Sequence, residues 1–180
     1  MKKIVIALVL LPLLSFQNVG KLVKTKFTEN ISGLIPENFF VMTQGDIIRR
    51  IPSSQTPLAA YTDEARLMDF SINVSVSKWK KEDINIAKDF FKASVFNLYD
   101  EVNLLKEEMK IINGKAFAVF EFESLLKGDG VSQKNLRKYT YIQYTIQGNN
   151  AYVFSFNSPL QLKKKWQLAA TEMMDNVKMK

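Results

Sequence analysis

The side chains that could do chemistry in this chain are carboxylates, hydroxyls and lysines, because its 180 residues include no histidine and no cysteine. A Ser-His-Asp relay, a thiol nucleophile, a disulfide and a His- or Cys-based metal site are therefore excluded. The best carboxylates for acid–base catalysis or calcium binding are Glu121 and Glu123, followed by Asp129. Alternate residues of a strand share a face and lie about 7 Å apart. Pairing with Lys138 or another basic residue across solvated strands explains these carboxylates better than catalysis does.

A glycine-containing loop from Lys127 to Asn135 separates two predicted strands. Loops on a rigid scaffold often carry binding residues, so Lys127, Asp129 and Lys134 are candidate partner contacts. An ordinary turn is the simpler interpretation of the sequence Lys-Gly-Asp-Gly that opens the loop. This sequence lacks the length and the following helix of a phosphate-binding loop, which argues against nucleotide binding.

Two further sets of side chains could contact a partner. Tyr139 and Tyr141 belong to a tyrosine-rich strand, and an exposed aromatic face would suit a carbohydrate or a peptide. Packing in the core and across strands is the interpretation we favour for them. Lys163 and Lys164 belong to a run of three lysines that could meet an acidic partner or an anionic membrane surface, although a solvated helix face explains the run more simply.

Residues 1–20 have the order of a secretory signal peptide, with two lysines followed by the apolar run from Ile4 to Leu14. That run is too short for a membrane span, which needs about 20 residues. No cysteine follows it, so a lipoprotein anchor is excluded. We therefore expect an exported protein, periplasmic or extracellular, with no transmembrane span in the mature chain. The cleavage site stays open.

The composition is typical of one soluble globular domain, with 47% hydrophobic and 24% charged residues. The net charge of +7 falls to +5 when Lys2 and Lys3 are removed with the signal peptide, because the first twenty residues contain no acidic side chain. A moderately basic chain is weakly attracted to acidic surfaces. Since exported proteins rarely meet DNA or RNA, we expect no nucleic-acid partner.

Hydrophobic periodicity predicts the strands that would position these residues. The clearest signal runs from Leu67 to Ser77, where apolar residues alternate with polar ones, as in a strand with one face on the core and one in solvent. Between Ile111 and Asn157, three apolar-rich runs are separated by Asn113-Gly114 and by Gly148-Asn149-Asn150. Asn-Gly favours a tight hairpin turn. This region is therefore predicted to be an antiparallel meander.

Three helices are predicted around the strands. A short one should begin after Thr43, and the last should begin with Ser158 as N-cap and Pro159 at the first helical position. The middle helix should run from Glu82 or Asp83 to Leu98 and lie across one face of the sheet. Its predicted core-facing residues are Ile86, Phe90, Ala93, Val95, Phe96 and Leu98.

The order of elements predicts an α+β fold in which an antiparallel β-sheet is packed between helices, an α/β/α sandwich. The helices are too few for repeated βαβ crossovers. Residues 21–33 are polar and basic, and we interpret them as a leader that is flexible or packs at an edge. Residues 34–180 should then form a single domain.

Several segments together resemble the PsbP/Mog-type family, and its small secreted bacterial members most of all. The segments are Pro36-Glu37-Asn38-Phe39, Phe70-Ser71-Ile72-Asn73-Val74, Ile112-Asn113-Gly114-Lys115 and Tyr152-Val153-Phe154-Ser155-Phe156 before a helix that carries Trp166. The resemblance is one of layout and covers about Ile35 to Lys178. It implies an α/β/α sandwich and a non-catalytic role: PsbP docks onto photosystem II, and the Mog-type protein binds the GTPase Ran. Metal contacts of PsbP-type proteins involve histidines, so no metal site is carried over.

These observations together predict a secreted or periplasmic, non-catalytic binding or accessory module that docks on a protein or an envelope component. We expect no catalytic residue, cofactor or metal. The alternative is a hydrolase or transferase of the cell envelope that uses carboxylates with Ser or Tyr. That alternative requires a concave pocket in which several polar groups converge.

Overall fold

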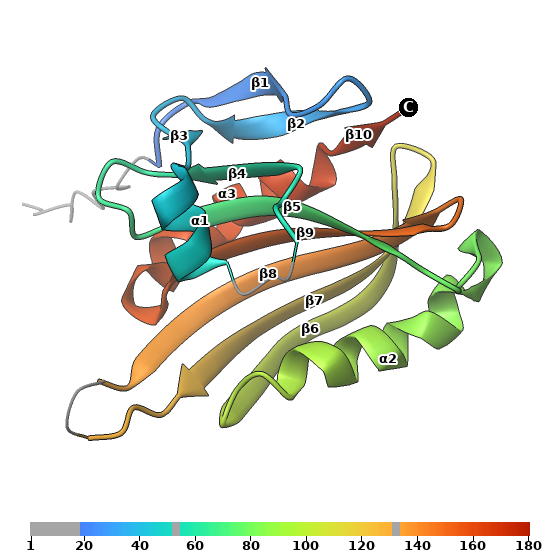
Figure 1. Cartoon of the computed structure of the whole chain (residues 1–180). Helices are drawn as coiled ribbons and strands as arrows, with labels where there is room; N and C mark the ends of the chain where they lie inside the picture. Colours follow the sequence, from blue (N-terminus) through green and yellow to red (C-terminus); the bar gives the residue numbers. More distant parts are fainter. Residues whose placement is uncertain (1–18, 52–54, 131–133) are drawn as a thin grey trace, which may run out of the picture.

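The computed structural model of the chain describes residues 19–51, 55–130 and 134–180 (Figure 1). The signal peptide predicted for residues 1–20 lies outside this range, except for its last two residues. The elements in chain order are β1 (Leu22–Lys26), β2 (Ile31–Pro36), β3 (Phe40–Val41), α1 (Gln44–Arg50), β4 (Ala59–Thr62), β5 (Asp69–Val76), a 3-10 turn (Lys81–Asp83), α2 (Ile84–Phe96), β6 (Glu101–Ile112), β7 (Lys115–Leu126), β8 (Leu136–Gln147), β9 (Asn150–Pro159), a second 3-10 turn (Leu160–Leu162), α3 (Lys163–Asp175) and β10 (Lys178–Met179).

A seven-stranded antiparallel sheet, in the order β3-β4-β5-β9-β8-β7-β6, forms the centre of the molecule. Its long strands β6 to β9 are consecutive hairpins, which confirms the predicted meander. The first turn has positive φ angles at Asn113 (47°) and Gly114 (80°), the combination that a tight hairpin turn requires. β6 is an edge strand, and its pairing with β7 shifts register between Leu104 and Lys106.

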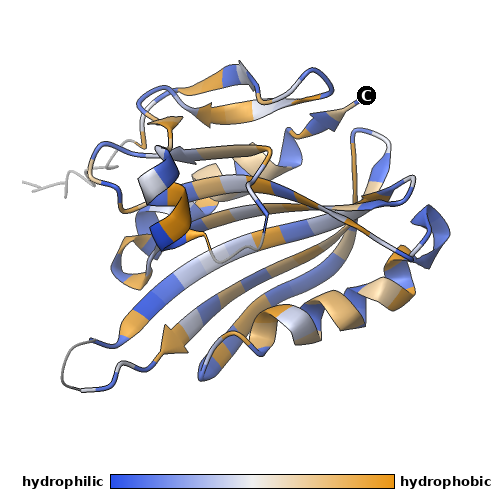
Figure 2. Ribbon diagram, in the orientation of Figure 1, coloured by the Kyte–Doolittle hydropathy of each residue, from blue (hydrophilic) through white to orange (hydrophobic). Residues whose placement is uncertain are grey.

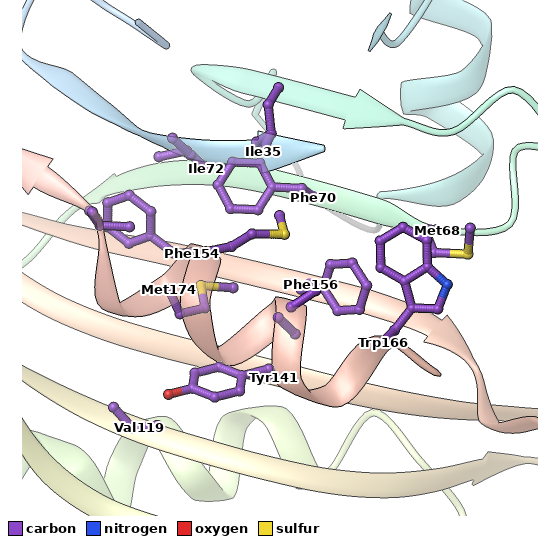
Figure 3. Close-up of a cluster of buried hydrophobic side chains, with 14 of the residues drawn as sticks. Ile35, Met68, Phe70, Ile72, Val119, Tyr141, Phe154, Phe156, Trp166 and Met174 are labelled. Carbon is purple, nitrogen blue, oxygen red and sulfur yellow. The ribbon is translucent and has the colours of Figure 1, made fainter. Parts of the chain in front are cut away.

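The two faces of this sheet are covered differently. On one face lie α3 and a small antiparallel sheet in the order β1-β2-β10, and on the other lies α2, across β6, β7 and β8 (Figure 1). The α3 face holds the larger core, in which Phe156 and Tyr141 of the sheet lie close to Trp166 and Met174 of α3 (Figure 3). The arrangement confirms the predicted α+β sandwich.

The predicted leader differs from the structure. Within residues 21–33, Leu22 begins strand β1 and Ile31 begins β2, and the two strands form an antiparallel hairpin. Ile31 and Ile35 are buried in the α3-side core. Their spacing places both on the inner face of β2, and this alternation is the signal that was missed.

The middle helix is present, but its buried stripe differs from the prediction. Apolar residues occur around much of α2 (Figure 2), so its sequence contains two candidate stripes. Its buried residues are Ile84, Ala87, Phe91 and Val95. Four of the predicted core residues are exposed instead: Ile86, Phe90, Ala93 and Leu98. Phe91 decides the orientation, because its ring stacks on Tyr144 of β8 at 4.4 Å between centroids.

The last helix begins four residues later than predicted. Strand β9 continues to Pro159, which pairs with Lys138 of β8, and α3 begins at Lys163 after the 3-10 turn. Beyond Asn157 the neighbour on the β5 side has ended, so the missing N–H of proline interrupts no ladder there. None of the helices among the described residues has the length and apolar character needed to cross a bilayer.

Candidate functional site

Tyr139 and Tyr141, predicted as possible partner contacts, are completely buried. Both point into the core beneath α3, where Tyr139 Oη donates a hydrogen bond to Glu121 Oε1 at 3.0 Å. The interpretation of these tyrosines as core residues is confirmed. Their proposed contact with a partner is wrong, because strand alternation directs their rings to the closed face of the sheet.

Glu121 and Glu123 share the α3 face of the sheet, but they are not the solvated partners of Lys138 that the sequence suggested. Glu121 is 2% exposed and also accepts a hydrogen bond from Gln167 of α3. Glu123 forms an ion pair with Lys163 at 2.6 Å, and hydrogen bonding from this lysine lowers the pKa of Glu123. Lys138 lies next to Tyr139 in β8 and therefore faces the opposite side. The two carboxylates tie α3 to the sheet.

The remaining predicted contacts lie on the surface. Lys163 is held by Glu123, whereas Lys164 is exposed. Lys127 forms an ion pair with Glu101 at 3.3 Å, and Asp129 and Lys134 are exposed in the same loop. Residues 131–133 of this loop lie outside the described part of the chain.

A set of side chains that the sequence did not single out converges on the α2 face of the sheet. A cavity of about 420 Å³ opens there between the end of α1, the C-terminal end of α2 and strands β5, β9 and β8. We call this cavity the α2-side pocket. Its volume falls in the range of about 300–1,000 Å³ that is common for small-molecule sites.

Three charged side chains form one end of the α2-side pocket: Arg50 at the end of α1, Asp69 of β5 and Lys138 of β8. Arg50 Nη2 lies 2.7 Å from Asp69 Oδ1. Arg50 is also held by Nη1, which donates to Thr62 Oγ1 at 3.2 Å. No carboxylate in the described ranges forms an ion pair with Lys138. Two cations therefore share one carboxylate.

Helix α1 delivers Arg50 to the pocket. Thr43 is its N-cap, as predicted, and forms a capping box in which Asp46 N donates to Thr43 Oγ1 at 3.2 Å. Such a box satisfies amide donors that the first turn leaves free. The hydrogen bond from Thr43 is the largest influence on Asp46 and lowers the pKa of its carboxyl to about 2. A short helix is thereby fixed at the end opposite Arg50.

Burial changes the acid–base behaviour of the charged end. Desolvation raises the pKa of Asp69 to about 6, and this effect exceeds the opposing influence of Arg50 and Lys138. Desolvation also lowers the pKa of Lys138. In both cases the environment penalises the charged form, because the side chains have lost water.

Neutral polar groups continue the charged end along β5 and β9. Ser71 and Ser155 oxygens lie 2.9 Å apart, and Asn73 Nδ2 donates to Ser71 Oγ at 3.2 Å. Asn73 Oδ1 is buried and has no hydrogen-bond partner within the described residues. Asp69 Oδ1 differs, because Arg50 Nη2 lies 2.7 Å from it. Most buried polar atoms in folded proteins are hydrogen-bonded, so Asn73 Oδ1 is an exception within the described residues.

The other side of the pocket is apolar. Val95 and Leu98 at the end of α2 face Phe122 of β7, and Leu126 and Leu136 close the wall at the paired ends of β7 and β8. Leu98, Leu126 and Leu136 remain 56%, 44% and 45% exposed. The loop containing Lys127, Asp129 and Lys134 leaves the sheet at these leucines, although its three candidates do not line the cavity. The pocket is thus polar towards β5 and apolar towards α2 and β7.

Some of the residues of this site stand out in the sequence, but the alternation predicts that they face solvent. Asp69, Ser71 and Asn73 are the polar half of the alternation in β5, and the expected wet face is wrong for the first two, which are buried. Pairing of β5 with β9 aligns Asp69 with Asn157 and Ser71 with Ser155. Only the tertiary structure brings Arg50 and Lys138 to the same place.

The arrangement is suited to binding. No cluster of three metal-ligating side chains occurs in the part of the chain that the structure describes. Ser71 Oγ is engaged by Ser155 and Asn73, and neither neighbour can act as a base to activate it. What converges in the pocket are hydrogen-bonding groups, two cations and an apolar wall.

Comparison with known proteins places the fold. No protein-family model matches the sequence, and a search of curated proteins finds no match. Among solved structures, cyanobacterial PsbP (CyanoP) from Synechocystis matches with a TM-score of 0.63 and 12% identity over 91% of this chain and 95% of that one. The Ran-binding protein Mog1p of Saccharomyces cerevisiae matches with a TM-score of 0.57 and 11% identity, over 89% of this chain and 96% of its own.

LpqN, a protein involved in cell envelope biogenesis of Mycobacterium tuberculosis, also matches, with a TM-score of 0.53 and 9% identity over 91% of this chain and 92% of that one. The chain therefore has the PsbP/Mog-like fold, as its segment layout suggested. At these identities the likeness concerns the fold, which hosts unrelated functions.

Proposed function

We propose that this chain is an exported, non-catalytic accessory module that binds a component of the cell envelope, and that the α2-side pocket holds this component. The observation that carries the proposal is the cavity itself, in which Arg50, Asp69 and Lys138 meet at one end and an apolar wall lies at the other. Preformed cavities with a few converging polar groups are the usual form of small-molecule sites.

The known proteins of this fold support an accessory role without defining it. Mog1p is a Ran-binding protein, and LpqN is involved in cell envelope biogenesis. An envelope component also agrees with the secretory character of residues 1–20. We extend the role of a binding module, and not any particular partner, to this chain.

Native mass spectrometry tests the proposal. The purified protein is incubated with a small-molecule extract of bacterial envelopes, desalted and sprayed under non-denaturing conditions. We expect a bound species that is released on denaturation. It should be lost in the double variant Leu98→Asp/Leu136→Asp, which places charges on the apolar wall of the pocket at positions that are already partly exposed.

Leu168→Asp is the matched control, because Leu168 is 80% exposed on α3 and does not line the pocket. This variant should retain the bound species. Absence of any bound species, or its retention by the double variant, would contradict the assignment of the pocket.

One observation favours the hydrolase alternative as a second candidate. A carboxyl with a pKa of about 6 is suited to acid–base work near neutral pH, and Asp69 lies on the same face of β5 as Ser71. Hydrolysis of p-nitrophenyl esters and glycosides by the wild type and by Asp69→Asn decides between the two functions. We expect no turnover above background from either. Turnover that disappears in the variant would establish the enzyme.

A further inference from the structure

We infer that the ligand of the α2-side pocket is a small amphipathic anion, a carboxylate with an unbranched apolar tail of the medium-chain fatty acid type. This inference rests on the proposed function and specifies the chemistry of its ligand. Three features of the pocket carry it: the excess of positive charge at one end, the apolar wall at the other, and the order in which the strands arrange them.

The charged end has an uncompensated cation. Arg50 is paired with Asp69 at 2.7 Å, whereas no described carboxylate forms an ion pair with Lys138. Lys138 is partly buried, and a cation that has lost part of its water gains from a nearby anion. An anionic head group between Lys138 and Arg50 would supply the missing charge. A cationic head group would add a third positive charge to the same place.

Hydrogen-bond donors and acceptors beside Lys138 suit a carboxylate. Thr140 donates to Asn157 Oδ1 at 2.8 Å, which leaves the amide Nδ2 of Asn157 as a further donor on the pocket lining. A carboxylate has two oxygens and can accept from a lysine and an amide together. Asp69 binds a proton more readily than an ordinary aspartate, so it can also donate to a head-group oxygen at mildly acidic pH.

The tail is defined by the wall opposite the charges. In the strand order β5-β9-β8-β7, the polar side chains lie on β5, β9 and the start of β8, and Phe122 and Leu126 lie on β7. Val95 of α2 and Leu98, just after the helix ends, cover the same side. A ligand that satisfies both ends must therefore carry its charge at one end and its apolar chain at the other.

The exposed leucines indicate where the apolar tail of the ligand would leave the pocket. Leu98, Leu126 and Leu136 line the pocket yet stay about half exposed. An apolar chain that lies against them removes this surface from water, with a gain of about 25 cal/mol per Å². A longer chain can extend past the leucines, so the pocket selects the head group more strictly than the chain length.

Isothermal titration calorimetry with decanoate below its micellar concentration tests the inference. Decylamine has the same chain with the opposite charge, and butyrate has the same head group with a short tail. We expect one decanoate per chain, with decylamine and butyrate each weaker by at least about tenfold, because a charge-assisted contact or most of the buried chain is lost.

Variants separate the head-group contacts from general effects on the protein. Lys138→Gln and Arg50→Gln should each weaken decanoate binding by about tenfold or more. Arg49→Gln and Lys164→Gln remove the same charges at exposed positions outside the pocket and should leave the affinity unchanged. Thermal melting of each variant shows that it is folded. If Arg50→Gln does not fold, Lys138→Gln decides alone.

The outcomes separate this inference from the proposed function. Equal binding of decanoate and decylamine, or unchanged affinity in Lys138→Gln, overturns the anionic head group. Decanoate could fail to bind while an envelope component binds the wild type and not Leu98→Asp/Leu136→Asp. In that case the pocket remains a binding site and the fatty-acid-like ligand is wrong. If neither binds, both proposals fall.

Discussion

The two faces of the central sheet are built from the same strands, but one is a closed core and the other contains a cavity. On the α3 face, large side chains close the space completely: Phe154, Phe156 and Tyr141 are 0% exposed. On the α2 face, the neighbouring residues Ser155 and Asn157 line a cavity. Successive residues of a strand point to opposite faces. Neighbouring residues of one strand therefore contribute in turn to the core and to the pocket. Substitutions can therefore act on one face with little effect on the other.

The largest expected effect is on the closed face. Phe154→Ala should lower the free energy of unfolding by about 3–5 kcal/mol, because it removes a buried ring that contacts Phe117 and leaves a cavity. Urea denaturation followed by tryptophan fluorescence measures the loss. Val153→Ala, in the adjacent residue that lines the pocket and is only partly buried, should cost clearly less. Equal losses of unfolding free energy in the two variants would contradict the difference between the faces.

The next effect concerns Asp69 and pH. Its pKa is about 6 in the folded protein against 3.8 for the ordinary group, so between these pH values the native state binds more protons than the unfolded state. Stability from this group is complete below pH 4 and declines as the pH rises through 6. The loss is about 3 kcal/mol for a shift of this size.

Chemical denaturation at pH 4, 5, 6 and 7 measures this decline, and Asp69→Asn isolates it, because other titrating groups are shared by the two proteins. The difference in stability between wild type and variant should change by about 2–3 kcal/mol across this range, in the direction that favours the wild type at low pH. A constant difference would show that the carboxyl titrates normally.

A smaller effect is expected from the cap of α1. Thr43→Ala removes the side chain that accepts from Asp46 N and should lower stability by about 1 kcal/mol. Because α1 ends at Arg50, its fraying should also reduce the affinity of the pocket for its ligand. Thr43→Ser retains the hydroxyl and should restore both properties. Lost stability with unchanged ligand affinity would separate the cap from the pocket.

The smallest effect is expected on the outer side of α2. Ile86 is 68% exposed, so Ile86→Ala should change stability by no more than about 0.5 kcal/mol. Ile84→Ala, on the buried side of the same helix, should cost about 2–5 kcal/mol. Thermal unfolding of both variants measures the contrast. A large loss of stability in Ile86→Ala would show that this residue belongs to the core, as the sequence predicted.

The sequence contained enough to predict the sheet but not the pocket. Asn113-Gly114 and the alternating strands specify local geometry directly, so the meander and the sandwich follow from short-range patterns. The buried side of α2 does not, because Phe90 and Phe91 are equally apolar and only contact with Tyr144 distinguishes them. Asp69 lies 19 residues from Arg50 and 69 from Lys138, and no periodicity indicates that the three side chains meet.

The register shift in β6 makes this edge of the sheet less able to pair with another strand. β6 has twelve residues at the edge of the sheet, and a straight edge of that length could pair with the same edge of another chain. The bulge between Leu104 and Lys106 interrupts the regular spacing of its hydrogen-bonding groups, and Lys106 and Lys110 add charge along it. A long edge strand that is bent and charged is therefore a poor template for a strand of a second chain.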